Sequence, residues 1–141
     1  MVHSNNRNLA GAAQSALRIA AGLAYFSHGA QKLFGWFGGV GPDGGTVELM
    51  SQYGAAGIIE TVGGALLVLG LFTRPVALIT SGEMAVAYFW MHWGQSGRMW
   101  WWDNRGEVVL LYSFIWLFFA AAGAGPFSLD AWRARRGADH T

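Results

Sequence analysis

The chain has 141 residues, enough for one domain, and its formal net charge of +1 gives no indication of a nucleic-acid partner. Only 12% of the residues are charged and 53% are hydrophobic, whereas a soluble domain is about 25% charged, so the composition argues against an ordinary soluble domain. Cysteine is absent, which excludes disulfides, thiol chemistry and cysteine-held iron–sulfur clusters.

Four apolar segments follow one another along the chain, near residues 15–37, 54–72, 75–93 and 107–124. Each is close to the ~20 residues that cross about 30 Å of hydrocarbon, where backbone polar groups must find partners within the segment, as in a helix. A soluble all-helical protein is the alternative, but it needs charged helix faces that Leu66–Phe72 and Val108–Ala122 lack. We therefore predict an all-α integral membrane protein: a four-transmembrane-helix bundle forming a single domain over residues 1–141.

The connections between these segments fit a bundle. Residues 71–75 form a very short link, so the second and third helices should pair as an antiparallel hairpin with Pro75 in the first helical turn. The glycine-rich first loop should lead into a short interfacial helix over Thr46–Tyr53. The last loop carries Trp100–Trp102, typical of an aromatic belt at the level of the lipid headgroups.

Basic residues are divided unequally between the two sides of the predicted bundle. The side with the N-terminus, the short link and the basic tail 131–141 holds Arg7, Arg18, Arg74, Arg133, Arg135 and Arg136. The other side holds Lys32, Arg98 and Arg105. The positive-inside rule then predicts both termini in the cytoplasm. We expect Arg18 to extend to the interface and the tail to be solvated rather than bound to anionic lipid.

Ionisable side chains inside apolar segments are costly, and here they gather in the outward half of the bundle. Every predicted helix contributes to this group: His28 and Lys32, Glu60, Glu83 and His92, and Glu107. His28 and Lys32 are four residues apart and share a helix face, with Tyr25 one turn before His28. Gly57, Thr61 and Gly64 form a small-residue stripe suited to close packing within the chain or in a dimer, so Glu60 should face a neighbouring helix.

Several interpretations of this polar group are open from the sequence. Lys32 can pair with Glu60 or Glu83 in a structural network, while Glu107 caps the start of its own helix. The excess of carboxyl groups can be relieved by protonation, by water, or by Arg98 or Arg105 folding inward. Two lone histidines give weak support for haem, so we expect neither haem nor a metal site.

Three stretches resemble the DoxX family of small bacterial membrane proteins. They are residues 27–35 (Ser-His-Gly-Ala-Gln-Lys-Leu-Phe-Gly), Glu60 to Gly64 continuing to residues 69–74, and Asn104 to Glu107 with the later residues 125–130. The family often has Asn-Gly-Gly-Glu in the last stretch, so Arg105 departs from it. The resemblance implies a four-helix membrane protein, which we expect in the bacterial inner membrane. It also implies an oxidoreductase function, since relatives are associated with thiosulfate:quinone oxidoreduction and quinone stress.

The leading hypothesis from these observations is a quinone-linked membrane oxidoreductase or a subunit of one. His28, Lys32, Glu60 and Glu83 are the candidate catalytic residues, and Tyr25, His92 and Glu107 are the candidate quinone-binding residues. Besides membrane lipid, a soluble redox partner protein and a second copy of the chain are expected partners. The alternatives are a non-catalytic membrane scaffold that recruits soluble redox enzymes, and a small transporter or lipid-binding protein.

Overall fold

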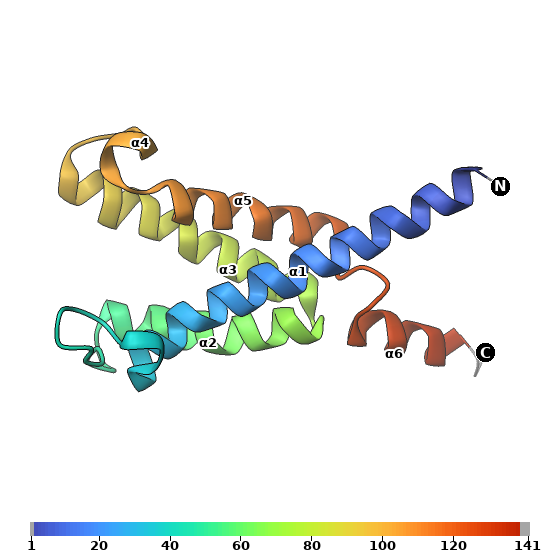
Figure 1. The fold of residues 1–141 in the computed structure, drawn as a ribbon, viewed down its shortest axis with the longest axis horizontal. Helices are drawn as coiled ribbons and strands as arrows, with labels where there is room; N and C mark the ends of the chain where they lie inside the picture. Colours follow the sequence, from blue (N-terminus) through green and yellow to red (C-terminus); the bar gives the residue numbers. More distant parts are fainter. Residues whose placement is uncertain (1, 139–141) are drawn as a thin grey trace.

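A computed structural model describes residues 2–138, with side chains from residue 6 onward. Regular structure in this part of the chain is helical, apart from an isolated bridge between Val40 and Gly45 (Figure 1). The long helices are α1 (Val2–Phe34), α2 (Gln52–Leu69), α3 (Thr73–Ala87) and α5 (Glu107–Ala122). The short ones are η1 (Trp36–Gly38), the π-helix η2 (Tyr88–Gly94), α4 (Trp101–Asn104) and α6 (Leu129–Ala138). The all-α prediction is confirmed.

The four predicted segments correspond to α1, α2, α3 with η2, and α5, but two neighbouring segments differ from the prediction. The interfacial helix expected over Thr46–Tyr53 is wrong, because residues 46–51 are irregular and α2 begins at Gln52. Ser51 ends this segment by capping α2, since its Oγ accepts from the N–H of Gly54 at 3.1 Å. The predicted tail 131–141 is helical in α6 as far as residue 138, and residues 139–141 lie outside the described part.

The bundle consists of two closely packed helix pairs, α1 with α2 and α3 with α5, while α2 and α3 touch less. Glycines bring α1 and α2 together: a Cβ on Gly29 would lie 2.4 Å from Thr61 Oγ1, and one on Gly64 would lie 2.7 Å from the backbone nitrogen of Phe26. The small-residue stripe of α2 therefore serves packing within the chain. We call the end where α1 begins and α6 ends the terminal end, and the end with η1 and α4 the loop end (Figure 1).

Arg18 joins three segments at the terminal end. Its side chain is fully buried, and its guanidinium donates to the carbonyl oxygens of Leu67 (2.5 Å), Val68 (2.6 Å), Ala124 (2.8 Å) and Phe127 (2.5 Å). The expectation that this side chain extends to the interface is wrong. The last carbonyls of a helix have no partner within it and favour a cation, so the end of α2 binds the guanidinium instead.

Asp130 of α6 caps the start of α3 in a second tie at this end. Its carboxylate accepts from the backbone N–H of Phe72 at 2.9 Å and from that of Thr73 at 2.8 Å. Burial acts to raise the pKa of Asp130, but the hydrogen bonds from Thr73 and Phe72 and the charge of Arg133 outweigh it and hold the pKa below its ordinary value. These two hydrogen bonds from the start of α3 to Asp130 hold α6 against the bundle.

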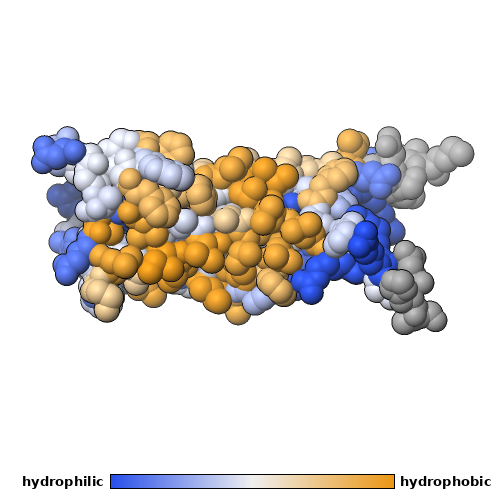
Figure 2. Space-filling model, turned by 90° about the horizontal axis from the view of Figure 1, so that it is seen from below, coloured by the Kyte–Doolittle hydropathy of each residue, from blue (hydrophilic) through white to orange (hydrophobic). Residues whose placement is uncertain are grey.

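The surface has an apolar band between two hydrophilic ends (Figure 2). Large apolar side chains such as Leu78, Ile79 and Phe114 are exposed along the band. Among the described helices, α2 is the one that is long and apolar enough to cross a membrane by length and composition, and α5 is apolar but has 16 residues. The buried core is small by comparison, with Tyr25 and Trp116 among its largest side chains.

Candidate functional site

An ion pair between Lys32 and Glu60 lies on the α1–α2 pair. Lys32 is in the last turn of α1, and its Nζ lies 2.5 Å from both carboxylate oxygens of Glu60 in α2. The Lys32 side chain can lie against α2 because Gly57 has no side chain: a Cβ on Gly57 would be 3.1 Å from that of Lys32. The sequence left Glu60 and Glu83 open as partners of Lys32, and the structure selects Glu60.

Glu83 of α3 is held by a different residue, Tyr25 of α1. The Tyr25 hydroxyl donates to Glu83 Oε2 at 2.8 Å, and this hydrogen bond joins the two helix pairs. The Tyr25 ring is buried against Tyr112 and Trp116 of α5, at centroid distances of 5.6 and 5.5 Å. Sequence reasoning missed Tyr112 and Trp116. They are four residues apart and share a helix face, a spacing that could have suggested an aromatic contact surface within the apolar run.

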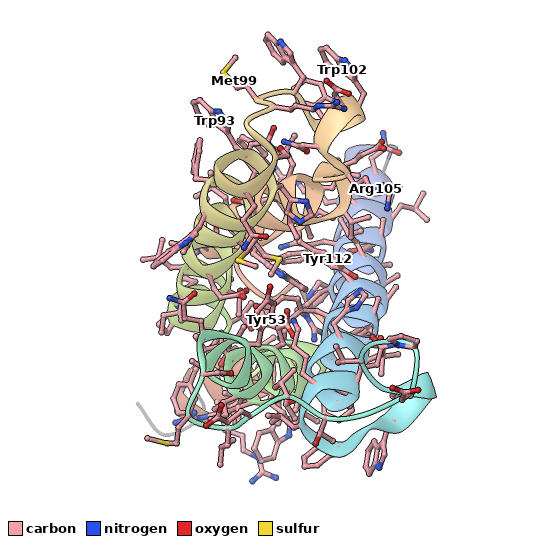
Figure 3. All side chains as sticks on the ribbon, turned by 90° about the vertical axis from the view of Figure 1, so that its left-hand side faces the viewer. Tyr53, Trp93, Met99, Trp102, Arg105 and Tyr112 are labelled. Atoms are coloured by element: carbon pink, nitrogen blue, oxygen red, sulfur yellow. The ribbon has the colours of Figure 1, made fainter. Side chains whose placement is uncertain are left out.

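A cavity of about 700 Å³ lies between α2 and the α3–η2 segment. Its wall contains Lys32, Glu60, Glu83 and His92, while most of the remaining wall is apolar, including Ile59, Ile79, Met84, Val86, Trp90 and Met91. In the view onto the loop end, Tyr53 lies toward the middle of the molecule, and Trp93, Met99 and Trp102 lie at one edge (Figure 3). Tyr53, which sequence reasoning did not select, also lines the cavity. The cavity therefore combines apolar volume with a few polar groups, as ligand sites do.

The π-helix η2 places His92 in the cavity wall. π-helical turns are uncommon and occur frequently at functional sites. Nδ1 of His92 lies 3.0 Å from the carbonyl oxygen of Asn104. Since a carbonyl oxygen only accepts, Nδ1 carries the proton in this contact and Nε2 is the nitrogen left for another partner. Asn104 itself is buried, and its side chain accepts from the N–H of Gly106 at 2.7 Å and donates to the carbonyl of Arg98 at 2.9 Å.

Three of the predicted site residues are not part of the cavity wall: Tyr25, which reaches it through its hydrogen bond to Glu83, and His28 and Glu107, which lie apart from it. His28 is exposed, with its ring 6.3 Å from that of Tyr112, and it is not among the residues of the cavity wall. Glu107 is exposed at the first position of α5, where a negative charge favours the helix start. The structure thus brings Tyr25, Lys32, Glu60, Glu83 and His92 together around one region and leaves His28 and Glu107 outside it.

The two arginines of the last loop do not fold inward. Arg98 pairs with Asp103 at 2.8 Å, and both side chains are well exposed. Arg105 is exposed and has a φ of 60°, in the left-handed region that favours glycine. This conformation explains why the Asn-Gly-Gly-Glu pattern of the DoxX resemblance has a glycine where this chain has Arg105. Among residues 2–138, no three histidine or acidic side chains gather so that they could hold a metal ion, and the absence of a haem or metal site stays a prediction.

An all-helical fold with an apolar band and a buried ion pair beside a cavity is typical of helical membrane proteins with an internal polar site. The DoxX family model matches residues 13–93, from the first half of α1 to η2. An uncharacterized protein of Haemophilus influenzae is 42% identical over 119 residues, which cover 81% of this chain and 85% of that protein. No solved structure matches the chain. The chain belongs to the DoxX family and is a membrane protein.

Proposed function

We propose that this protein is a quinone-linked oxidoreductase of the bacterial inner membrane, or the quinone-binding subunit of one, with its site in the cavity between α2 and α3. One observation carries the proposal: an apolar cavity of about 700 Å³ borders the Lys32–Glu60 pair and Glu83. Cavities that bind small molecules usually measure about 300–1,000 Å³. A quinone fits this combination because its apolar tail partitions into lipid and its ring presents two oxygens that need polar contacts.

The proposal includes a four-span topology with α1, α2, the continuous α3–η2 segment and α5 crossing the bilayer. It is supported by the apolar band across the middle of the face in Figure 2 and by the arrangement that puts the start of α1 and the end of α6 at one end (Figure 1). The arginines of α6 and Arg74 lie at that terminal end, which the positive-inside rule places in the cytoplasm. The cavity would then lie in the outward half of the bundle and open toward lipid.

Three polar atoms in the cavity wall would contact the quinone ring. Lys32 has three N–H donors, and its two hydrogen bonds to Glu60 leave one for a ligand oxygen. Glu83 uses Oε2 to accept from Tyr25, which leaves Oε1 to accept or carry a proton. His92 uses Nδ1 for Asn104, which leaves Nε2. When bound, a quinone would supply two-electron, two-proton chemistry at its two oxygens.

The protein's own contribution would be to hold and move protons beside the ring. Glu83 and Lys32 lie on different helices and would each donate a proton to a different ring oxygen, and Glu60 would then return a proton to Lys32. The electrons would come from a soluble redox partner protein or a small reductant at the loop end. His28 is given no direct ligand contact in this proposal, because it lies outside the cavity wall.

Organic extraction of the gently purified protein, followed by mass spectrometry, tests the proposal through the amount of bound quinone per chain. We expect about one. Gly82 lines the cavity, and a Cβ on it would meet no atom within 4 Å, so a larger side chain fits there without disturbing the fold. Gly82→Leu should fill the cavity and remove the quinone, while Gly82→Ala is the matched control and should retain it.

Two outcomes would contradict the proposal in different ways. Quinone retained by the Gly82→Leu protein would place the ligand outside this cavity. No quinone in the wild-type protein, together with a copurifying soluble redox enzyme and an intact bundle, would favour the scaffold alternative. Quinone-dependent turnover should also fall in Glu83→Gln without a loss of folded protein, and unchanged turnover would remove Glu83 from the mechanism.

A further inference from the structure

A second cavity, of about 430 Å³, lies at the terminal end of the bundle, far from the ion pair near the loop end. The start of α3, the end of α5 and the start of α6 surround it, and Phe72, Arg74, Gly123, Ser128 and Asp130 are among its lining residues. This cavity is separate from the one that the proposed function uses. Its polar groups are of a different kind, because an arginine, Arg74, lines it.

Arg74 presents hydrogen-bond donors to this cavity. Its Nη1 donates to the carbonyl oxygens of Ala121 at 2.5 Å and Ala120 at 3.2 Å, near the end of α5. Its Nη2 and Nε lie on the side of Gly123, which also lines the cavity. Because both backbone contacts use one nitrogen, the others keep N–H groups free for an anion.

Arg133 contacts Phe72, one of the residues that line this cavity. The guanidinium carbon of Arg133 lies 5.2 Å from the centre of the Phe72 ring, a cation–π contact. Phe72 has a φ of 51°, which is unusual for a bulky residue, and the Asp130 carboxylate holds its backbone N–H. Asp130 is three residues before Arg133 in α6, so the same cap fixes both the ring and the helix that carries the arginine. Within residues 6–138, no hydrogen-bond acceptor contacts the Arg133 guanidinium.

Exposed aromatic rings accompany the arginines where the apolar band meets the terminal end. Phe72 is 53% exposed, Phe127 67% and Trp132 44%, and Arg136 lies 3.9 Å from the centre of the Trp132 ring. Aromatic rings with adjacent arginines are typical of the headgroup level of a bilayer. A guanidinium stacked on a ring still presents its edge N–H groups, which match a phosphate in bidentate geometry.

We propose that this cavity binds the phosphate headgroup of an anionic phospholipid, with Arg74 and Arg133 holding the phosphate and the acyl chains lying along the apolar band. Asp130 also lines the cavity as a negative charge; its oxygens accept two backbone N–H groups and the charge of Arg133 acts on it, so the two arginines leave a net positive charge beside it. A zwitterionic headgroup carries an ammonium group that the two arginines disfavour, so the site should prefer phosphatidylglycerol to phosphatidylcholine.

Native mass spectrometry of the full chain with added phosphatidylglycerol or phosphatidylcholine of matched acyl chains tests this site. The wild type should bind phosphatidylglycerol more tightly. Arg133→Gln should weaken that binding about fivefold, the effect of one arginine near an anionic headgroup, in a protein that remains folded. Arg135→Gln is the matched control: it removes the same charge from the same helix, and Arg135 makes no ring contact within the described residues. Its affinity should stay within about twofold of wild type.

Three results would overturn the proposal. Equal binding of the two lipids would remove the preference for an anion. Equal losses in Arg133→Gln and Arg135→Gln would indicate diffuse attraction by the charge of α6 rather than a site. Displacement of the lipid by inorganic phosphate would indicate a site for a soluble anion.

Discussion

Replacing Lys32 by Met should destabilise the protein more than replacing Glu60 by Gln, although each change breaks the same ion pair. The Glu60 side chain is 3% exposed and the Lys32 side chain is 22% exposed. Without Lys32, the Glu60 carboxylate loses two hydrogen bonds where water reaches it poorly, which costs roughly 3 kcal/mol of unfolding free energy. Without the charge of Glu60, the Lys32 ammonium still lines the cavity and can be hydrated there, so the loss should be only about 1 kcal/mol.

The double variant Lys32→Met/Glu60→Gln should resemble Glu60→Gln alone, because it leaves no buried charge without a partner. The unfolding free energies of the four proteins, measured by denaturant titration in one detergent, form a double-mutant cycle. Equal losses in the two single variants would refute the reasoning from exposure. A double variant as unstable as Lys32→Met would show that the loss comes from the changed shape of the side chain rather than from an unpaired carboxylate.

Arg18→Lys should lower the unfolding free energy by at least about 3 kcal/mol, because one ammonium cannot reach four carbonyls in two segments, α2 and the loop after α5; wild-type stability in this variant would contradict that role. Gly29→Ala should cost about 2–3 kcal/mol in thermal unfolding, since its Cβ would lie 2.5 Å from the backbone nitrogen of Thr61. Gly82→Ala, in open space inside α3, is the control and should raise stability by up to about 1 kcal/mol, because alanine is the better helix former. The folded-state pKa of Asp130 is below the ordinary 3.8, so its stabilising effect should be complete above about pH 5 and disappear as the pH falls through the folded-state value. Asp130→Asn should remove that part of the pH dependence of stability, and an unchanged acid profile would argue against the capping role.

Much of the helical layout could be predicted from local pattern. Length and apolar composition gave the four long segments, and Pro75 fell in the first turn of α3 as expected. The small-residue stripe correctly turned Glu60 toward a neighbouring helix. The helix predicted over residues 46–53 was wrong for two reasons. Ser51 caps α2, so the helix begins only after it. The residues before Ser51 contact α1 instead, where the N–H of Val47 donates to the carbonyl of Lys32 at 2.9 Å.

The site was only partly predictable, because contacts between residues far apart in the sequence decide which side chains pair with one another. Both Glu60 and Glu83 could reach Lys32 in a bundle whose helix order around the axis was unknown. The prediction that Arg18 extends to the interface was wrong for the same reason. Its hydrogen-bond acceptors are backbone carbonyls 49 to 109 residues away, and a backbone carbonyl cannot be recognised from the residue type. Tyr25 was selected by its spacing from His28, yet it is Tyr25 that reaches the interior, while His28 is exposed.

The π-helix has a consequence for how this protein tolerates changes in length. Compared with an α-helix, η2 accommodates extra backbone between Tyr88 and Gly94, and so it sets the rotational register of the residues that follow relative to α3. Deleting a single residue within it would allow an ordinary α-helix to form. The residues after the deletion would keep nearly the orientation they have now, because the wide π turns take up about one residue more than the α-helical turns that would replace them. Relatives that lack one residue here would therefore keep the surrounding helix in register but lose the wide turn that places His92 in the cavity wall, so a gap in this segment separates members by the chemistry of their site.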